Sequence, residues 1–285
     1  MSHDAGQHAF PKAPLPKFSL PKAKKSLGQH FLVDAHYIAR IVAAIQPQAD
    51  ERMVEIGPGP GALTRPLLQT LAQLDVVEVD RDMVTRLQNE FPADRLRVHA
   101  VDALVFDFAS LGPGLRVVGN LPYNISSPLL FHLAESAASI IDMTFMLQKE
   151  VVDRMAAAAD TPEYGRLSVM LQSRFKVSKL FNVPPGAFQP PPKVDSAIVR
   201  LVPLTPQEIP YRNAKVFADV VARAFGQRRK TLRNTLKGLA DEAVFLELNI
   251  DPRRRGETLS VHEFAALANC LEVNSLAVHS LKGSA

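Results

Sequence analysis

Three carboxylates stand at the ends of three expected strands. Glu55 lies in the strand at 52–56, Glu78 lies at the end of the next strand, and Asp102 follows the third. The carboxyl ends of parallel strands meet at one edge of a sheet, where ligands bind near a topological switch point. Three acids at such an edge favour a cationic ligand that carries amines and hydroxyl groups. Acids that end strands are often only solvated, but this explanation is weak for all three together.

The first of these strands runs into a glycine-rich loop, GPGPGA at 57–62. Glycines let the backbone turn tightly and approach a ligand closely. The loop fits the G-x-G-x-x-[GA] pattern of dinucleotide sites, and Glu78 lies at about the offset of a ribose-binding acid. The loop alone therefore leaves open a nicotinamide dinucleotide and S-adenosylmethionine. Pro58 and Pro60 lack the N–H groups that a pyrophosphate would use, which favours S-adenosylmethionine.

The fourth expected strand, at 115–119, ends in the run GNLPYNISSP at 119–128. The side-chain oxygen of Asn120 can accept one hydrogen of a substrate amine while a backbone carbonyl accepts another. Tyr123 can stack on the flat ring that bears this amine. An amine on a base is a poor nucleophile because its lone pair is delocalised, and two fixed acceptors favour its pyramidal form. A proline turn with a buried tyrosine is the alternative interpretation.

Strand and helix patterns alternate over much of the chain. The expected strands lie at 52–56, 75–79, 96–99, 115–119, 141–147, 174–183 and 194–202. The expected helices lie at 34–46, 62–73, 81–91, 128–139, 148–157 and 165–173, with Asp34, Asp80 and Ser127 as candidate N-caps. This alternation is typical of a doubly wound, Rossmann-like α/β sheet. The last two strands are joined too closely for a crossover helix, so we expect that pair to be antiparallel.

Composition divides the chain into three parts. Residues 1–25 hold five lysines, four prolines and one acid and predict a flexible basic tail. Residues 26–205 carry 16 basic and 19 acidic side chains and form the expected catalytic α/β domain. Residues 206–285 carry 12 basic and nine acidic side chains and predict a smaller all-α domain, with helices near 210–225, 228–238, 241–248 and 260–271. Three prolines between 203 and 210 mark the boundary.

The helical part contains a run of cations without an intervening acid. The residues are Arg223, Arg228, Arg229, Lys230, Arg233 and Lys237. On a helix that begins at about 228, Arg229, Arg233 and Lys237 lie four residues apart and share one face. Such a face favours a polyanionic partner, and we expect it to bind RNA phosphates. A solvated helix face without a partner is the alternative.

Several protein classes are disfavoured by what the sequence lacks. No apolar run approaches the roughly 18 residues of a membrane span, and residues 1–25 lack a secretory hydrophobic core. Cys270 is the single cysteine, which excludes an internal disulfide and is typical of a reducing cytoplasm. We expect no metal site, because there is one cysteine and no H-E-x-x-H motif. Neither a G-x-S-x-G motif nor a G-x-x-x-x-G-K-[ST] phosphate loop is present.

These motifs, with several others, resemble the ribosomal RNA adenine N6-dimethyltransferase family. The runs are KKSLGQHFL (24–32), VEIGPGPGALT (54–64), VEVDRDM (77–83), GNLPYNISSP (119–128), QKEVVDRM (148–155), YGRLSVMLQ (164–172) and PPGAFQPPPKVDSAIVRL (184–201). They occur in the family's order over roughly residues 22–240. The chain is most similar to the bacterial small-subunit KsgA (RsmA) type, whose C-terminal signature resembles the run at 225–238.

The resemblance implies roles for individual residues. The expected contacts with S-adenosylmethionine are His30, Leu32, Gly57, Glu78, Asp102 and Asn120. Glu78 would hold the ribose hydroxyls and Asp102 the adenine amine. The expected catalytic group is Asn120, Leu121, Pro122, Tyr123 and Phe188, in which the two aromatic rings would sandwich a flipped adenine. Many members of the family have Asn at the position of His30.

The sequence therefore predicts an S-adenosylmethionine-dependent enzyme. It would dimethylate the N6 amines of two adjacent adenosines in 16S rRNA, within the small ribosomal subunit or its precursor. We expect a cytoplasmic monomer without a metal. Two alternatives are an NAD(P)-dependent oxidoreductase, supported only by the loop pattern, and a non-catalytic RNA-binding assembly factor with a vestigial cofactor site.

Overall fold

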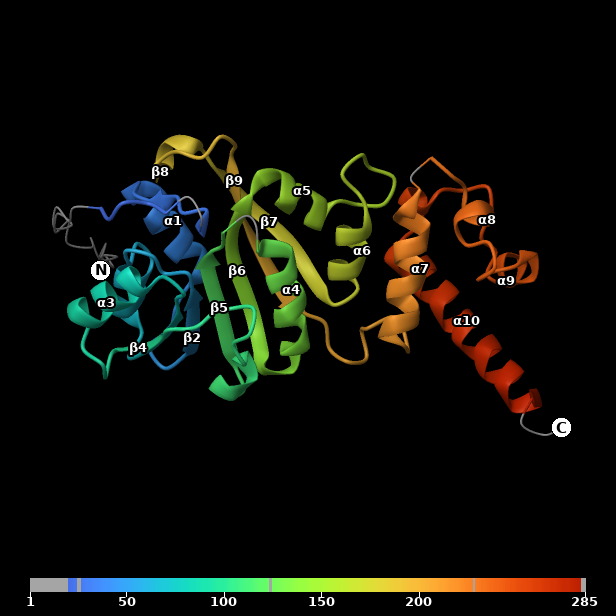
Figure 1. The fold of residues 1–285 in the computed structure, drawn as a ribbon, viewed down its shortest axis with the longest axis horizontal. Helices are drawn as coiled ribbons and strands as arrows, with labels where there is room; N and C mark the ends of the chain where they lie inside the picture. The colour runs from blue at the N-terminus through green and yellow to red at the C-terminus, as the bar shows by residue number, and fades with distance from the viewer. Residues whose placement is uncertain (1–19, 25–26, 123–124, 228, 283–285) are drawn as a thin grey trace, which may run out of the picture.

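A seven-stranded sheet forms the centre of the computed structural model (Figure 1). Its strands are β2 Arg52–Ile56, β3 Leu74–Val77, β4 Leu96–His99, β5 Leu115–Asn120, β6 Ile140–Gln148, β7 Phe175–Val183 and β9 Ser196–Pro203. Their order is β4-β3-β2-β5-β6-β9-β7. Neighbours from β4 to β6 are parallel, whereas β9 is antiparallel to both β6 and β7. The predicted α/β sheet and its antiparallel last pair are confirmed.

The structure describes residues 20–24, 27–122, 125–227 and 229–282, and only the backbone of 274–282. The helices of the sheet domain are α1 Ala35–Ile45, α2 Thr64–Thr70, α3 Arg81–Glu90, α4 Ser126–Glu135, α5 Lys149–Ala156 and α6 Arg166–Gln172. The short 3₁₀ turns are η2 Phe108–Leu111, η3 Ala137–Ser139, η4 Pro185–Ala187 and η5 Gly256–Thr258. Asp34 and Asp80 cap α1 and α3 as predicted, but Ser127 lies inside α4.

Side chains along the central strands alternate between two faces of the sheet. Met53 and Val118 pack with residues of α1, α2 and α3 in one buried cluster. Their neighbours Val54 and Val117 pack with residues of α4, α5 and α6 in another. Successive residues of a strand point to opposite faces, so strands covered on both faces are apolar nearly throughout. The sheet is therefore a rigid middle layer whose strand ends are held in fixed positions.

The chain leaves β2 toward β3 and β4 on one side and returns to β5 on the other. This reversal is the topological switch point, where the loops after β2 and β5 separate and leave room for a ligand. Ile56 pairs with Gly119 in the register of these two strands. A Cβ atom at Gly119 would lie 2.5 Å from the carbonyl oxygen of Ile56, so the close approach of the two backbones requires glycine here.

A second, two-stranded sheet was not predicted from the sequence. β1 Phe31–Leu32 is antiparallel to β8 Phe188–Gln189. This pairing ties the segment before α1 to the connection between β7 and β9, although about 157 residues separate them along the chain. It thereby fixes the segment that precedes α1 beside the carboxyl ends of the central strands.

The C-terminal helices gather at the end of the molecule that lies away from β4 (Figure 1). They are α7 Ala214–Gly226, α8 Leu232–Thr235, α9 Glu242–Glu247 and α10 Val261–Lys282. They share a buried cluster with Tyr164 and Val169, which come from the sheet domain around the start of α6. None of the helices in the described part of the chain is long and apolar enough to cross a membrane.

The prediction of a helix at 228–238 is wrong. Of the described residues in this range, only Leu232–Thr235 is helical, and Arg229 and Lys230 lie in a turn and a bend. Thr231 has an extended backbone with ψ of 162°. The N–H groups of Leu232 and Arg233 donate to the carbonyl groups of Arg254 and Pro252, at 2.8 and 3.0 Å. The first-turn N–H groups therefore bind a neighbouring loop, and the predicted single helix face does not exist.

We expect the substitution Gly119→Ala to lower the free energy of unfolding by about 1–3 kcal/mol, because the added methyl group overpacks the contact between β2 and β5. Urea denaturation measures this change. The matched control is Gly226→Ala, where a Cβ atom meets nothing within 4 Å at the end of α7. It should change the stability by no more than about 1 kcal/mol, with a stabilising sign. Equal stabilities of the two variants would contradict the close approach.

Candidate active site

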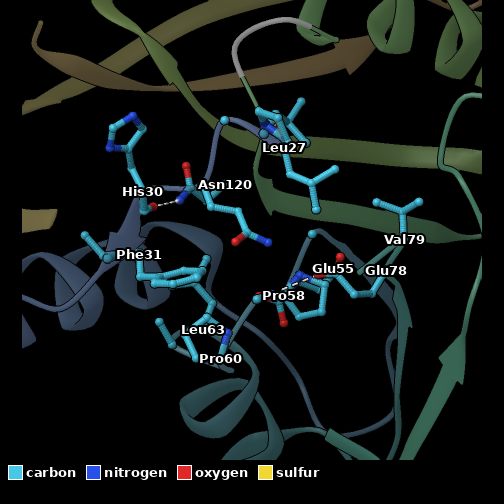
Figure 2. Close-up of a pocket in the computed structure, with 18 of the residues that line it drawn as sticks. Leu27, His30, Phe31, Glu55, Pro58, Pro60, Leu63, Glu78, Val79 and Asn120 are labelled. Carbon is cyan, nitrogen blue, oxygen red and sulfur yellow. Dashed lines mark hydrogen bonds between the residues drawn. The ribbon is translucent and has the colours of Figure 1, made fainter. Parts of the chain in front are cut away.

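A cavity of about 210 Å³ lies at the carboxyl ends of the central strands (Figure 2). Its walls come from the glycine loop after β2, the residues after β3, β4 and β5, and the segment just before and within β1. The six predicted cofactor contacts all line it, namely His30, Leu32, Gly57, Glu78, Asp102 and Asn120. Leu121 and Pro122 line it as well. The fold thus brings together residues that are distant in the chain, such as His30 and Asn120, which are 90 positions apart.

The glycine loop is held against the neighbouring strand by its own backbone. Gly57 has a φ of +66° and Gly59 a φ of +54°, which is the left-handed region that favours glycine. The N–H of Gly57 donates to the carbonyl of Val77 at 3.0 Å. The N–H of Gly59 donates to Oε2 of Glu78 at 3.2 Å. The loop therefore has one defined path, and its backbone is open to a ligand on the cavity side.

Glu55 is the most deeply buried acid of the cavity wall, with 2% of its surface exposed. The hydroxyl of Thr64 donates to its Oε2 at 2.6 Å. Burial raises the pKa of the Glu55 carboxyl to about 7, and the nearby charge of Glu78 adds to the shift. The carboxyl can therefore be neutral or charged near neutral pH, depending on what occupies the cavity.

Glu78 and Asp102 complete the acidic lining. Burial raises the pKa of Glu78, and hydrogen bonds from the backbone of Asp80 and Gly59 offset part of this effect. The Asp80 bond, to Oε1 of Glu78, is 2.8 Å long. Asp102 is exposed at the rim and accepts a hydrogen bond from the N–H of Leu104 at 2.9 Å. Three carboxyl groups around one cavity favour a cationic ligand and disfavour an anionic one.

Asn120 ends β5, the strand beside β2, and lines the same cavity as these acids. Its Nδ2 donates to the backbone carbonyl of His30 at 3.1 Å, as the dashed line in Figure 2 shows. A carbonyl oxygen can only accept, so this bond fixes which end of the amide is nitrogen. The Oδ1 atom remains as an acceptor for a substrate amine.

The side chain of His30 does not point into the cavity. Figure 2 shows its ring turned outward, while its backbone lies beside Asn120. The Nδ1 atom of the ring lies 2.8 Å from the carbonyl oxygen of Pro190. Residue 30 therefore faces the cavity through its main chain, and the cavity does not require a particular side chain at this position.

Two predicted site residues, Tyr123 and Arg228, lie outside the residues that the structure describes. Phe188 is described, but it is 4% exposed in β8 opposite Leu32 and does not line the cavity. The stacking of Tyr123 and Phe188 on a target base therefore stays a prediction. Within the described ranges, no group of three or more His, Cys, Asp or Glu side chains is placed to hold a metal ion.

The predicted RNA-binding residues that the structure describes are exposed but do not share a helix face. Arg229, Lys230 and Lys237 lie in the turns that flank α8. Two others already have acidic partners. Arg223 pairs with Asp219 through Nε and Oδ2 at 3.0 Å, and Arg233 pairs with Glu242 at 2.7 Å.

A second group of cations near α8 was missed by the sequence analysis. The loop at 252–254 accepts the backbone hydrogen bonds of Leu232 and Arg233, so it lies directly beside α8. It carries the first two arginines of the run RRR at 253–255. Arg253 is 84% exposed and pairs with Asp251 at 2.9 Å, whereas Arg254 bonds to Glu263. The run is visible in the sequence, but nothing local indicates that it joins the cations at 229–237.

A sequence model of the family described as Ribosomal RNA adenine dimethylase matches residues 20–272. The chain belongs to this family. It is 57% identical to Ribosomal RNA small subunit methyltransferase A of Aromatoleum aromaticum, over 89% of this chain and 96% of that protein. It is 58% identical to the protein of the same name in Thiobacillus denitrificans, over 86% of this chain and 96% of that protein.

The fold comparison agrees with the family. The crystal structure of a dimethyladenosine transferase from Plasmodium falciparum is 27% identical, with a TM-score of 0.74 over 86% of this chain and 98% of that chain. Family membership makes the chain an rRNA adenine methyltransferase, and the interpretation as an NAD(P)-dependent oxidoreductase is wrong. The cavity gives a physical reason, because Pro58 and Pro60 line it without an N–H group and acids surround it.

The buried Glu55 predicts a distinct dependence of stability on pH. Its pKa is about 7 when folded and near 4.5 when unfolded, so the folded state binds the proton more tightly. The stability it contributes is present below about pH 4.5 and is lost as the pH rises through 7. We expect the unfolding free energy of the wild type, minus that of Glu55→Gln, to fall by about 2–3 kcal/mol from pH 5 to pH 8. Urea denaturation across this range measures it, and a constant difference would contradict the burial of the carboxyl group.

Proposed function

We propose that the protein transfers methyl groups from S-adenosylmethionine to the N6 amines of two adjacent adenosines in 16S rRNA, within the small ribosomal subunit or its precursor. The observation that carries this proposal is that acids and the amide of Asn120 face one cavity at the switch point of the sheet. The relatives named small-subunit methyltransferase A support the choice of RNA.

The donor set of the cavity fits S-adenosylmethionine. This cofactor supplies a methyl group bound to a cationic sulfur. Glu55 and Glu78 offset positive charge, and Glu78 lies after β3 where it can accept from ribose hydroxyls. Asp102, exposed at the rim, can accept from the adenine amine. The backbone of Gly57 and Gly59 lets the cofactor lie close to the loop.

Asn120 then acts on the target base. Its Oδ1 accepts one hydrogen of the N6 amine, and a backbone carbonyl nearby accepts the other. Held in this way, the amine is pyramidal and its lone pair is directed at the methyl group. The methylated nitrogen carries an extra proton that is acidic and leaves readily, so the residues need not include a strong base. Tyr123 completes the proposed site by stacking on the adenine. Phe188 is 4% exposed in β8, so its ring would have to leave this buried position to stack on the same base.

We also propose that two parts of the chain have different roles. Residues 26–205 bind the cofactor and perform the transfer, and the helical part at 206–285 binds rRNA. We propose a cytoplasmic monomer. A non-catalytic assembly factor would bind subunits without modifying them. Incubation with labelled cofactor and small subunits that lack the modification, followed by mapping of the label, separates the two functions.

We expect Asn120→Ala to lower the rate of methyl transfer by about 10²–10³-fold, because it removes a preorganised hydrogen-bond acceptor from the reacting amine. Single-turnover assays on small subunits that lack the modification measure the rate. The matched control is Asn89→Ala, which changes an exposed asparagine of α3 outside the cavity and should keep wild-type activity. A folded Asn120→Ala protein with a near wild-type rate would contradict the role of the amide.

If the exposed cations around α8 bind RNA phosphates, their removal should weaken RNA binding and reduce its dependence on salt. We expect the double substitution Arg229→Gln and Lys237→Gln to weaken subunit binding. The slope of the logarithm of the binding constant against the logarithm of the salt concentration should become shallower by about 0.7–0.9 for each phosphate that is no longer neutralised. Arg233 is left unchanged because Glu242 already pairs with it. The control pair is Arg97→Gln and Lys176→Gln, two exposed cations on the edge strands β4 and β7. Equal salt slopes for both pairs would mean that the cations near α8 do not face RNA.

A further inference from the structure

Asp80 lies two residues after Glu78 and its side chain is fully buried, with 0% exposure. The carboxylate accepts hydrogen bonds from Nζ of Lys24 at 2.6 Å and from Nε2 of Gln29 at 2.9 Å. It also caps α3 by accepting from the N–H of Asp82 at 3.0 Å. Two of its three donors therefore come from the segment before β1, which is more than 50 residues away in the chain.

Residues 27–32, which we call the strap, form one wall of the cavity. Gln29 is bonded at both ends of its amide, because its Oε1 accepts from the N–H of Lys24 at 2.8 Å while its Nε2 donates to Asp80. At its other end the strap pairs with β8 through Phe31 and Leu32. The strap is therefore anchored on both sides of His30.

The carbonyl of His30 is the group that orients Asn120. It belongs to the residue directly after Gln29, so a shift of Gln29 moves this carbonyl. Asp80 is also bonded to Glu78, because the backbone N–H of Asp80 donates to Oε1 of Glu78 at 2.8 Å. A continuous chain of bonded groups thus runs around the cavity from Glu78 through Asp80 and Gln29 to Asn120.

We propose that Asp80 and Gln29 are positioning residues that act through the carbonyl of His30 to keep Oδ1 of Asn120 available to the target amine. The inference rests on the proposed function of Asn120. Without the anchor, the amide can rotate and present Nδ2, which repels an amine hydrogen. Small misplacements of a reacting group cost up to about 10²-fold in rate, even when the changed residue is remote from the chemistry.

The contact can be reversed while the helix cap is kept. Gln29→Glu places a second carboxylate against Asp80, so acceptors face each other. Asp80→Asn restores a donor, because Asn also caps helices through Oδ1 while its Nδ2 faces residue 29. The double variant therefore contains the same contact with donor and acceptor exchanged. Gln73→Glu, directly before β3, adds the same charge outside the cavity and is the matched control.

The test is the single-turnover rate at saturating S-adenosylmethionine on small subunits that lack the modification, with cofactor affinity and unfolding midpoint measured alongside. We expect Gln29→Glu to lower the rate by about 10²-fold, and Asp80→Asn added to it to recover at least about tenfold. In an Asn120→Ala background, Gln29→Glu should cost less than about threefold, because its effect passes through that amide. A wild-type rate for Gln29→Glu, or no recovery in the folded double variant, overturns the proposal.

A second measurement does not depend on activity. The side-chain amide signal of Asn120 in ¹⁵N-asparagine-labelled protein, identified by its disappearance in Asn120→Ala, reports the bond to His30. We expect this signal to shift or broaden in Gln29→Glu, to return in the double variant, and to be unchanged in Gln73→Glu. An unchanged signal in Gln29→Glu overturns the inference. Failure of the wild type to methylate subunits instead contradicts the proposed function, and the amide signal still tests the anchor.

Discussion

The close approach of β2 and β5 at Ile56 and Gly119 is the constraint on which the site depends. Because the two backbones are in register up to this point, the glycine loop and Asn120 leave the sheet side by side. Glu55 and Asn120 are therefore set by strands rather than by flexible loops. Rigid elements hold reacting groups more accurately than loops do, and this accuracy is what a site that aligns an amine with a methyl group needs.

The buried acids of the cavity destabilise the folded protein, and binding of a cationic ligand removes this destabilisation. Burial raises the pKa of Glu55 and of Glu78, which means that the charged carboxylates are destabilised in the folded protein. A cationic ligand stabilises the same charges. The acids thus lower the stability of the fold and raise the affinity for a cation, which is the usual conflict between stability and function at a binding site.

The strand ends, the glycine loop and the acids could be predicted because each has a local signature in the sequence. Apolar runs indicate the strands, and the residues that follow each strand must lie at the edge of the sheet. The contact between Gln29 and Asp80 has no such signature, since 51 residues separate them and neither belongs to a periodic pattern. The helix predicted at 228–238 is wrong because a four-residue spacing of cations defines a face only where the backbone is helical, and Thr231 is extended.

The run KKSLGQHFL at 24–32 could only be matched to a family from its sequence, whereas the contacts give it a physical meaning. Lys24 and Gln29 bind Asp80, Gly28 turns with a φ of +62°, and the main chain of His30 holds Asn120. Two of these contacts go to Asp80, which does not line the cavity, and one goes to Asn120, which does. The contact of residue 30 with Asn120 is made by a backbone carbonyl, which every residue type has. The side chain at position 30 can therefore vary without loss of this contact. The side chains of Lys24 and Gln29 each bind the buried carboxylate of Asp80, whereas the ring of His30 is turned away from the cavity.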